Sequence, residues 1–418
     1  MGCPGPRRRC MPTPRARSRL MRNERIAMTA GAAHLFDVPS GGISLAGGVP
    51  DLSPIEMRGL SEQVGRQIRL GGPTILQYST METPSDLVEA IEDLAGRESM
   101  HPLASNLVPT SGSQLGLVAV CRALVADGEY IATEELTYPG ALSAFAWCGA
   151  RVAPVPMDEE GLVPEALVET VTRVRASGGR LDVLYTVPTF HNPTGRTQGT
   201  GRRQRLLEAC EALDVHVIED NPYGMLSFTG RELPALKSMS PAGVTYLGTF
   251  SKVFVPGLRC GWIDPAAQYH ERIRGAVETA TLSPSPIAQA IIAGHHRRCG
   301  WDRAIARFRE IYAGKAMTLS EALVASGLDR DRWSWREPDG GFYLWLTDAT
   351  GVDASGLAEA ARRAGIALVP GARFGGTGAA RAGLRLSFSG ASESELHVAA
   401  DRLCAVISGA GTVQEGAA

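Results

Sequence analysis

Residues 249–262, TFSKVFVPGLRCGW, place one lysine and one arginine seven positions apart in a largely apolar stretch. The chain has only three lysines, Lys237, Lys252 and Lys315, so 39 of its 42 basic residues are arginines. Arginine cannot lose its proton inside a protein, whereas a desolvated lysine can, and its neutral amine can form an imine. Lys252 is therefore a candidate reactive amine. The alternative is a surface lysine whose aliphatic stem covers apolar neighbours.

The residues around Lys252 indicate an anion-binding loop. VTYLGTF, residues 244–250, is typical of a buried strand, and Ser251 and Arg259 flank the lysine just after it. A hydroxyl, an amine and a guanidinium near the carboxyl end of a strand suit a phosphorylated ligand. SGSQLGL, residues 111–117, opens a helix whose free N–H groups can also hold an anion. A serine N-cap explains the same residues equally well.

The pattern of the whole chain predicts an α/β fold. From about residue 105 to 265, continuous Val/Ile/Leu runs alternate with helical segments, which indicates a large, doubly wound, mostly parallel sheet. A long helical pattern follows over residues 286–326, with a break expected at Cys299–Gly300. The strand-like GFYLWLT and a closing helix over residues 391–408 then indicate a smaller α+β domain.

We expect the following divisions of the chain: a disordered leader (1–28), an N-terminal segment associated with the small domain (29–50), a large domain (51–290), a small domain (291–410) and a flexible tail (411–418). The leader is rich in Arg and Pro and lacks the apolar segment of a secretory signal. Translation starting at Met11, Met21 or Met28 is the alternative, and too few serines are present to favour a transit peptide.

The composition argues against several other functions. A net charge of −2 gives no electrostatic basis for binding nucleic acid or a membrane surface. The chain has no apolar run near the length of about 20 residues that spans a bilayer. Its eight cysteines are dispersed without a CxxC pair, which argues against zinc and against a disulfide framework. We therefore expect a cytoplasmic protein that acts on small molecules.

Two polar residues follow other strand-like runs. Asp220 ends HVIED, where a carboxylate either caps a helix or pairs with a cationic ring nitrogen. Asn192 precedes Pro193 in HNPTG, which is first a turn signal and second a candidate functional amide. Neither residue decides a function alone.

The motifs together, in this order, resemble the class I/II aminotransferases of pyridoxal-phosphate fold type I. The motifs are SGSQ, TYPG, HNPTG, DNPYG, TFSK with PGLR, and LRLSFS. ISLAGGVPD, LQYS and LYTVP are similar to the 2-aminoadipate/kynurenine subgroup, which also occurs as the enzyme domain of some transcription regulators. The resemblance covers residues 43 to 405, and TFSK with its following arginine is its most specific element. No extension of helix-turn-helix length precedes the domain, so we do not expect a regulator.

This resemblance implies pyridoxal 5′-phosphate as the cofactor. Lys252 would bind it covalently and later move a proton between the substrate α-carbon and the cofactor. Asp220 would keep the ring nitrogen protonated. Asn192 and Tyr223 would hydrogen-bond the phenolic oxygen of the ring, and Tyr138 would stack on the ring.

The resemblance also implies the phosphate and substrate sites. The phosphate would be bound by Ser113, Gln114, Ser251 and Arg259, with Tyr78 reaching in from the partner of a homodimer whose active sites are shared across the interface. Arg385 would bind the substrate carboxylate in bidentate fashion, assisted by the Gly48 backbone and Asn192.

The implied function is transfer of the amino group of an L-amino acid to a 2-oxo acid, 2-oxoglutarate or pyruvate, by a ping-pong mechanism. β-Elimination, decarboxylation or oxidation with the same cofactor is the alternative, as is a ligand-binding module that kept the fold. Met81, Glu82 and Thr83 replace a small turn of the family, and His191 replaces another polar residue. Either departure could line the substrate pocket, or His191 could lie outside it. The substrate and its place in primary or specialised metabolism stay open.

Overall fold

The computed structural model describes residues 41–414, with side chains to residue 409. The expected leader, residues 1–28, lies outside the described residues, as do most of the N-terminal segment and the last four residues of the tail. Within the described part, none of the helices is both long and apolar enough to cross a bilayer.

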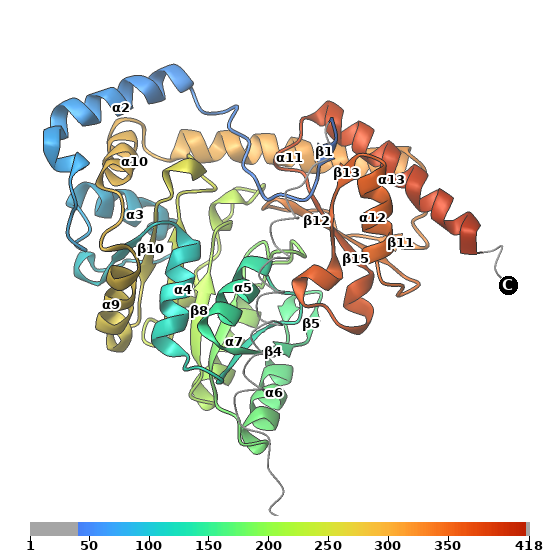
Figure 1. The fold of residues 1–418 in the computed structure, drawn as a ribbon, viewed down its shortest axis with the longest axis horizontal. Helices are drawn as coiled ribbons and strands as arrows, with labels where there is room; N and C mark the ends of the chain where they lie inside the picture. Colours follow the sequence, from blue (N-terminus) through green and yellow to red (C-terminus); the bar gives the residue numbers. More distant parts are fainter. Residues whose placement is uncertain (1–40, 415–418) are drawn as a thin grey trace, which may run out of the picture.

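A seven-stranded sheet forms the centre of the larger part of the molecule (Figure 1). Five adjacent strands of this sheet run parallel to one another, which confirms the predicted mostly parallel sheet. One strand, β10 (Gly261–Asp264), runs antiparallel to both neighbours and was not predicted. The spatial order is β2 (Val108–Thr110), β10 (Gly261–Asp264), β9 (Val244–Thr249), β8 (His216–Asp220), β7 (Leu181–Thr186), β3 (Tyr130–Glu134) and β4 (Arg151–Val155).

Helices cover both faces of this sheet because successive side chains of a strand point to opposite sides. Val183 and Tyr185 of β7 belong to the hydrophobic core on one face, whereas Leu184 belongs to the core on the other. This confirms the doubly wound fold. The first face packs against α4 (Ser113–Leu124), α5 (Pro139–Cys148) and α9 (His270–Thr281), and the second against α6 (Pro164–Ala176) and α7 (Thr200–Ala212).

A four-stranded antiparallel sheet forms the centre of the smaller part. Its order is β11 (Trp333–Ser334), β12 (Tyr343–Asp348), β15 (Gly383–Ser387) and β14 (Val369–Pro370), and its helices are α12 (Ser355–Arg363) and α13 (Glu393–Gln414). The short strand β1 (Ile43–Ser44) pairs with β13 (Ile366–Ala367). The first described residues of the chain therefore contact the small part before the chain continues into the large part.

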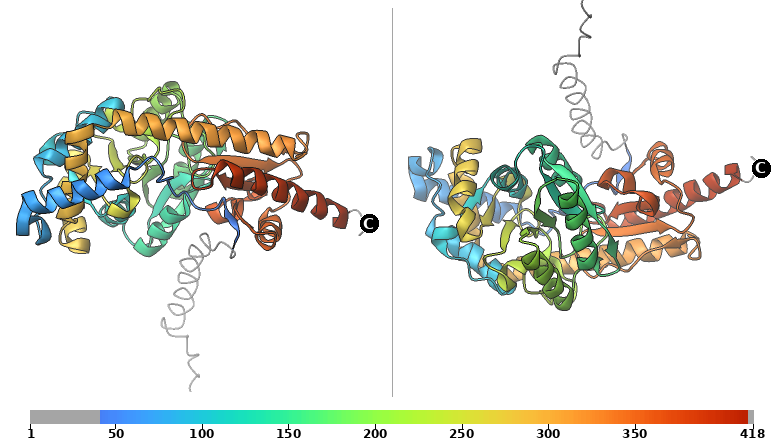
Figure 2. Two further views of the ribbon diagram at one scale, coloured as in Figure 1. Left: turned by 90° about the horizontal axis from the view of Figure 1, so that it is seen from above. Right: turned by 90° about the horizontal axis from the view of Figure 1, so that it is seen from below.

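Two helices connect the parts. The predicted break is present: α10 (Pro286–Cys299) ends at Gly300, which has a φ of 60°, and α11 (Asp302–Ala325) begins just after it. Helix α10 packs against α3 (Ser85–Arg97) and α2 (Met57–Gly71), whereas α11 extends along the molecule to pack on α13 (Figures 1 and 2). The two consecutive helices thus pack on different parts of the molecule, α10 on the helices of the large part and α11 on a helix of the small part.

Candidate active site

A cavity of about 260 Å³ opens where β7, β8 and β9 end, between the large sheet and the small part. The carboxyl ends of parallel strands are the usual place for a ligand in such sheets. Of the predicted site residues, all but Tyr78 line this cavity. They are Gly48, Ser113, Gln114, Tyr138, Asn192, Asp220, Tyr223, Ser251, Lys252, Arg259 and Arg385.

The amine of Lys252 lies inside the cavity and not on the outer surface. Its Nζ donates a hydrogen bond to the Gly48 carbonyl at 2.9 Å. Burial and the positive charges of Arg259 and Arg385 lower the pKa of Lys252 to about 8, against an opposing effect of Asp220. The amine is therefore closer to its neutral, nucleophilic form than that of an ordinary lysine.

Asp220 ends β8 with one oxygen bound and one free. Its Oδ2 accepts a hydrogen bond from the Tyr185 hydroxyl at 2.8 Å, while its buried Oδ1 has no partner within the described part of the chain. Burial raises the pKa of Asp220 to about 6. A buried carboxylate oxygen without a partner is costly, so this atom fits a ligand that brings a positively charged N–H group.

An anion cradle lies at the other end of the cavity, where α4 begins. Gly112 has a φ of 84°, and a Cβ at this position would lie 2.2 Å from Nη2 of Arg259. Only glycine therefore lets the guanidinium approach the free N–H groups at the start of α4. Arg259 also donates to the Ser251 hydroxyl at 3.4 Å. The predicted combination of hydroxyl, guanidinium and helix N-terminus is present.

Arg385 approaches the cavity from β15 in the small part. Its Nη1 donates to Oδ1 of Asn192 at 2.8 Å, its Nη2 donates to the Ala46 carbonyl, and its Nε has no partner within the described residues. The guanidinium stacks 4.4 Å from the centre of the Tyr343 ring. A planar fork of donors held by aromatic packing is suited to a carboxylate.

Nine of the twenty residues that line the cavity were missing from the site expected from the sequence, and three of these nine contact its charged or titratable side chains. Tyr185 bonds Asp220, Tyr343 bonds the Tyr223 hydroxyl at 2.9 Å, and Ala46 contacts Arg385. Tyr185 and Tyr343 stand within LYTVP and GFYLWLT, whose patterns indicate strands. LYTVP also belongs to the motifs that resemble the 2-aminoadipate/kynurenine subgroup, but that resemblance gave Tyr185 no role. The alternation of side chains along a strand predicts which residues share a face of the sheet. It does not predict which residue of that face lines a cavity.

The residues that depart from the family pattern do not line the cavity of their own chain, and the expectation that Met81, Glu82 and Thr83 line the site of a partner subunit stays a prediction. Met81 packs in the hydrophobic core, and the side chain of His191 is buried outside the cavity. His191 Nδ1 lies 2.9 Å from the Thr194 hydroxyl, and its Nε2 lies 4.0 Å from Glu134. Burial lowers the pKa of His191 to about 3, so the imidazole is neutral. Of the two interpretations of His191, the position outside the pocket agrees with the structure. Tyr78 is 81% exposed and also lies outside the cavity.

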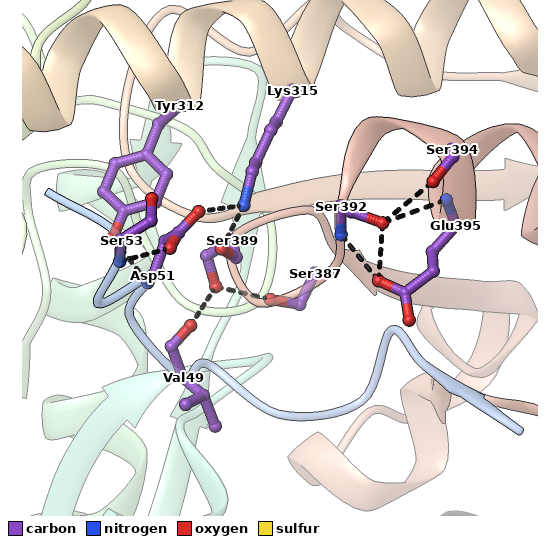
Figure 3. A network of polar contacts seen from close by, with 10 residues as sticks. All are labelled: Val49, Asp51, Ser53, Tyr312, Lys315, Ser387, Ser389, Ser392, Ser394 and Glu395. Carbon is purple, nitrogen blue, oxygen red and sulfur yellow. Dashed lines mark hydrogen bonds and ion pairs between the residues drawn. The ribbon is translucent and has the colours of Figure 1, made fainter. Parts of the chain in front are cut away.

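Residues 46–51, which we call the strap, run along the cavity, and Ala46 and Gly48 line it. The strap provides the carbonyls of Ala46 and Gly48 that accept hydrogen bonds from Arg385 and Lys252. Its far end is anchored by Lys315, whose Nζ donates to Oδ2 of Asp51 at 2.5 Å and to the Ser389 carbonyl at 3.1 Å (Figure 3). The ion pair to α11 thus holds the strap in place together with two hydrogen bonds, one that the Asp51 N–H donates to Tyr312 and one that Ser389 donates to the Val49 carbonyl.

Replacing Lys315 by methionine should loosen the strap. Asp51 then loses its charged partner, and we expect a loss of about 1–3 kcal/mol in unfolding free energy together with a several-fold change in substrate KM. Thermal unfolding and steady-state kinetics measure the two effects. Lys237→Met is the matched control, because Lys237 is equally buried and donates to three backbone carbonyls away from the strap. An unchanged KM in Lys315→Met would contradict the anchoring role.

The arrangement as a whole fits a flat aromatic ligand with three features. Its anionic end would lie at α4 and Arg259, a protonated nitrogen at Asp220, and a carbonyl group able to react with an amine at Lys252. Arg385 remains for a second ligand that carries a carboxylate.

Comparisons with known proteins agree with this geometry. The family model described as aminotransferase class I and II matches residues 43–403. Aromatic-amino-acid aminotransferase 1 of Thermococcus litoralis is 32% identical over 370 residues, 87% of this chain and 88% of that protein.

Two solved structures extend the comparison to the fold. Kynurenine aminotransferase of Pyrococcus horikoshii, in complex with PMP, KYN and KYA, is 28% identical with a TM-score of 0.81, over 96% of this chain and 95% of that chain. LysN, the alpha-aminoadipate aminotransferase of Thermus thermophilus, complexed with N-(5′-phosphopyridoxyl)-L-leucine, is 29% identical with a TM-score of 0.81, over 92% of this chain and 98% of that chain. The resemblance predicted from the motifs is confirmed.

Proposed function

Because this chain belongs to the class I and II aminotransferases, we propose that the cavity around Lys252 is its active site. The chain is a pyridoxal-phosphate enzyme that moves the amino group of an L-amino acid to a 2-oxo acid. The relatives are aminotransferases, which does not favour elimination, decarboxylation or oxidation. The observation that carries the proposal is that the predicted residues from both parts of the molecule meet in one cavity.

Lys252 holds the cofactor and moves the proton in this proposal. Pyridoxal phosphate, when bound, supplies an aldehyde that takes up the substrate nitrogen and a ring that withdraws electrons from the α-carbon. The lowered pKa of Lys252 makes its amine available both as a nucleophile and as a base at the α-carbon.

The surrounding side chains orient the ring. We assign Asp220 to the ring nitrogen, since its Oδ1 has no other partner within the described residues. Tyr185 fixes the other oxygen of Asp220 and so directs the free one. Asn192 and Tyr223 would bond the phenolic oxygen, and Tyr138, at the start of α5, would stack on the ring.

The phosphate site would be completed by a second copy of the chain. Ser113, Gln114, Ser251 and Arg259 would bind the phosphate from within one subunit. The large apolar side chains Leu70, Leu76, Tyr78 and Leu282 are each more than 60% exposed in the single chain. Such residues favour a homodimer in which Tyr78 of one subunit reaches the site of the other.

We also propose that the chain forms two domains with different roles. Residues 51–290 would form the large domain that binds the cofactor, and residues 291–410 the small domain that brings Arg385. Pairing of β1 with β13 supports the association of the N-terminal segment, residues 29–50, with the small domain. A cytoplasmic location stays a prediction from the sequence.

The cavity favours substrates with an uncharged, aromatic side chain. Its cations are Lys252, Arg259 and Arg385, and each has a proposed partner in the cofactor or the substrate α-carboxylate. No further cation remains among the described lining residues for a carboxylate on the substrate side chain. The apolar side chains of Leu117 and Val187 and the ring of Tyr343 are also part of the lining.

A panel of amino donors with 2-oxoglutarate or pyruvate as acceptor tests this proposal. Phenylalanine, tyrosine and kynurenine should give a higher kcat/KM than 2-aminoadipate and aspartate in a coupled assay. Release of ammonia, CO₂ or peroxide without formation of a new amino acid would contradict transamination. A preference for the acidic donors would contradict only the substrate class.

A further inference from the structure

The hydroxyl of Tyr343 lies against the hydroxyl of Tyr223 at 2.9 Å, and both side chains are buried. Within the described part of the chain, neither hydroxyl has another hydrogen-bond partner. In such a pair only one oxygen donates its hydrogen to the other. Which of them donates decides what Tyr223 can offer to a ligand in the cavity.

We propose that Tyr343 is a positioning residue that donates its hydrogen to Tyr223, so that Tyr223 donates its own hydrogen toward the cofactor ring. The inference rests on the proposed function, in which Tyr223 bonds the phenolic oxygen of the ring. If Tyr223 donated to Tyr343 instead, only its lone pairs would face that oxygen, and two acceptors would repel each other. A hydrogen bond received by Tyr223 also strengthens the one that it donates.

The surroundings hold Tyr343 in this orientation. Its ring stacks on the Arg385 guanidinium at 4.4 Å, and a Cβ at Gly48 would lie only 2.0 Å from its hydroxyl oxygen. Gly48, which belongs to the strap, therefore provides the space that the hydroxyl occupies. The hydroxyl has one neighbouring acceptor within the described residues, and that acceptor is the oxygen of Tyr223.

The charged and titratable groups that face the pair come from four elements. They are Tyr138 at the start of α5, Asp220 at the end of β8, Lys252 after β9, and Arg385 on β15. The positive charge of Arg385 favours a phenolate at Tyr223, whereas burial disfavours it more strongly and holds the pKa of Tyr223 well above its usual range. Tyr223 is thus a neutral donor across the working pH range.

The test is a pH titration of the visible absorbance of the holoenzyme. Tyr343→Phe keeps the ring and its packing on Arg385 but removes the donor. A weaker bond from Tyr223 stabilises the anionic phenolic oxygen less, so the apparent pKa of the chromophore should rise by about half to one pH unit. The substrate KM should stay within about twofold, because the packing of Arg385 is kept. An unchanged or lowered apparent pKa would overturn the proposal.

Tyr246→Phe is the matched control. Tyr246 is also a buried tyrosine with one side-chain hydrogen bond, which its hydroxyl donates to Glu98 at 2.8 Å, but it neither lines the cavity nor contacts the strap. Its replacement should lower stability and leave the apparent pKa of the chromophore unchanged. An equal rise in both variants would mean that the titration reports packing, and the proposed hydrogen bond would be wrong.

A double-mutant cycle separates this inference from the function on which it rests. Tyr223→Phe alone should raise the apparent pKa, and Tyr343→Phe should add nothing in that background, because Tyr343 acts through Tyr223. A full additional shift would overturn the proposed relay. If Tyr223→Phe had no effect but the unaltered holoenzyme transaminated normally, the assignment of Tyr223 to the phenolic oxygen would fail and the relay with it.

Discussion

Lys252→Ala should lose the visible and near-ultraviolet absorbance of the bound cofactor in its covalent form, and at least about 10³-fold of kcat. The expectation follows from two roles that meet in one amine, the covalent attachment of the cofactor and the movement of the α-proton. The described cavity lining offers no second amine, because Lys237 and Lys315 are held elsewhere by backbone carbonyls and Asp51. Absorbance spectra and single-turnover kinetics measure both losses.

Lys252→Arg is the matched control for charge. The guanidinium retains the positive charge at this position but cannot lose its proton or form an imine. The Lys252→Arg variant should therefore be as inactive as Lys252→Ala. It should bind the cofactor, through its phosphate, at least as tightly as Lys252→Ala does. Substantial turnover and a retained absorbance band in either variant would show that Lys252 is not the reactive amine.

Asp220→Asn should lower kcat by about 10²- to 10⁴-fold with a much smaller effect on substrate KM. A neutral amide cannot keep the ring nitrogen protonated by its charge, so electron withdrawal from the α-carbon weakens. The amide oxygen can still accept the hydrogen bond of Tyr185, so the local packing is retained. Kinetics of the half-reaction and the position of the absorbance maximum are the measurements.

Asp264→Asn controls for the loss of a buried carboxylate. Asp264 ends β10, is 5% exposed, and accepts a hydrogen bond from Asn106 at 2.6 Å outside the cavity. This variant should lose stability and keep kcat. Equal losses of kcat in the two variants would indicate a general effect of buried charge and contradict a specific role for Asp220.

The large sheet could be predicted well because its signals are local. A run such as HVIED carries its burial and its strand propensity within a few residues, and the anion loop follows its strand directly. Strand β10 was missed because four residues after a Pro-Gly turn give too short a pattern to distinguish from a loop. The resemblance to a family then supplied the roles that local patterns cannot.

The contacts inside the site could not be predicted, because they join distant segments. Arg385 and Asn192 are 193 positions apart, Lys252 and Gly48 are 204 apart, and Tyr343 and Tyr223 are 120 apart. No periodicity in the chain encodes such a pair. The residues could be nominated one by one, but the hydrogen bonds between them needed the structure.

All three lysines of this chain are at least partly buried, but only one of them lies where it could react with a ligand. Lys237 and Lys315 are each 6% exposed and donate to backbone carbonyls, although neither lines the active-site cavity. A compact ammonium with three donors fits a small group of carbonyls where a wide guanidinium would not. Lys252 also donates to a carbonyl and differs in lying where a ligand can reach it.

The strap also bears on discrimination among ligands by size. Because Arg385 already donates to the Ala46 carbonyl and to Asn192, an incoming carboxylate exchanges these hydrogen bonds for its own. Part of the attraction is therefore offset, and a small anion such as acetate gains less by entering than it would at a guanidinium without partners. A substrate gains further affinity from contacts of its amino group and side chain, which the strap does not replace. The Ala46 carbonyl thus competes with the ligand carboxylate for Arg385, and a complete substrate has the additional contacts needed to displace it.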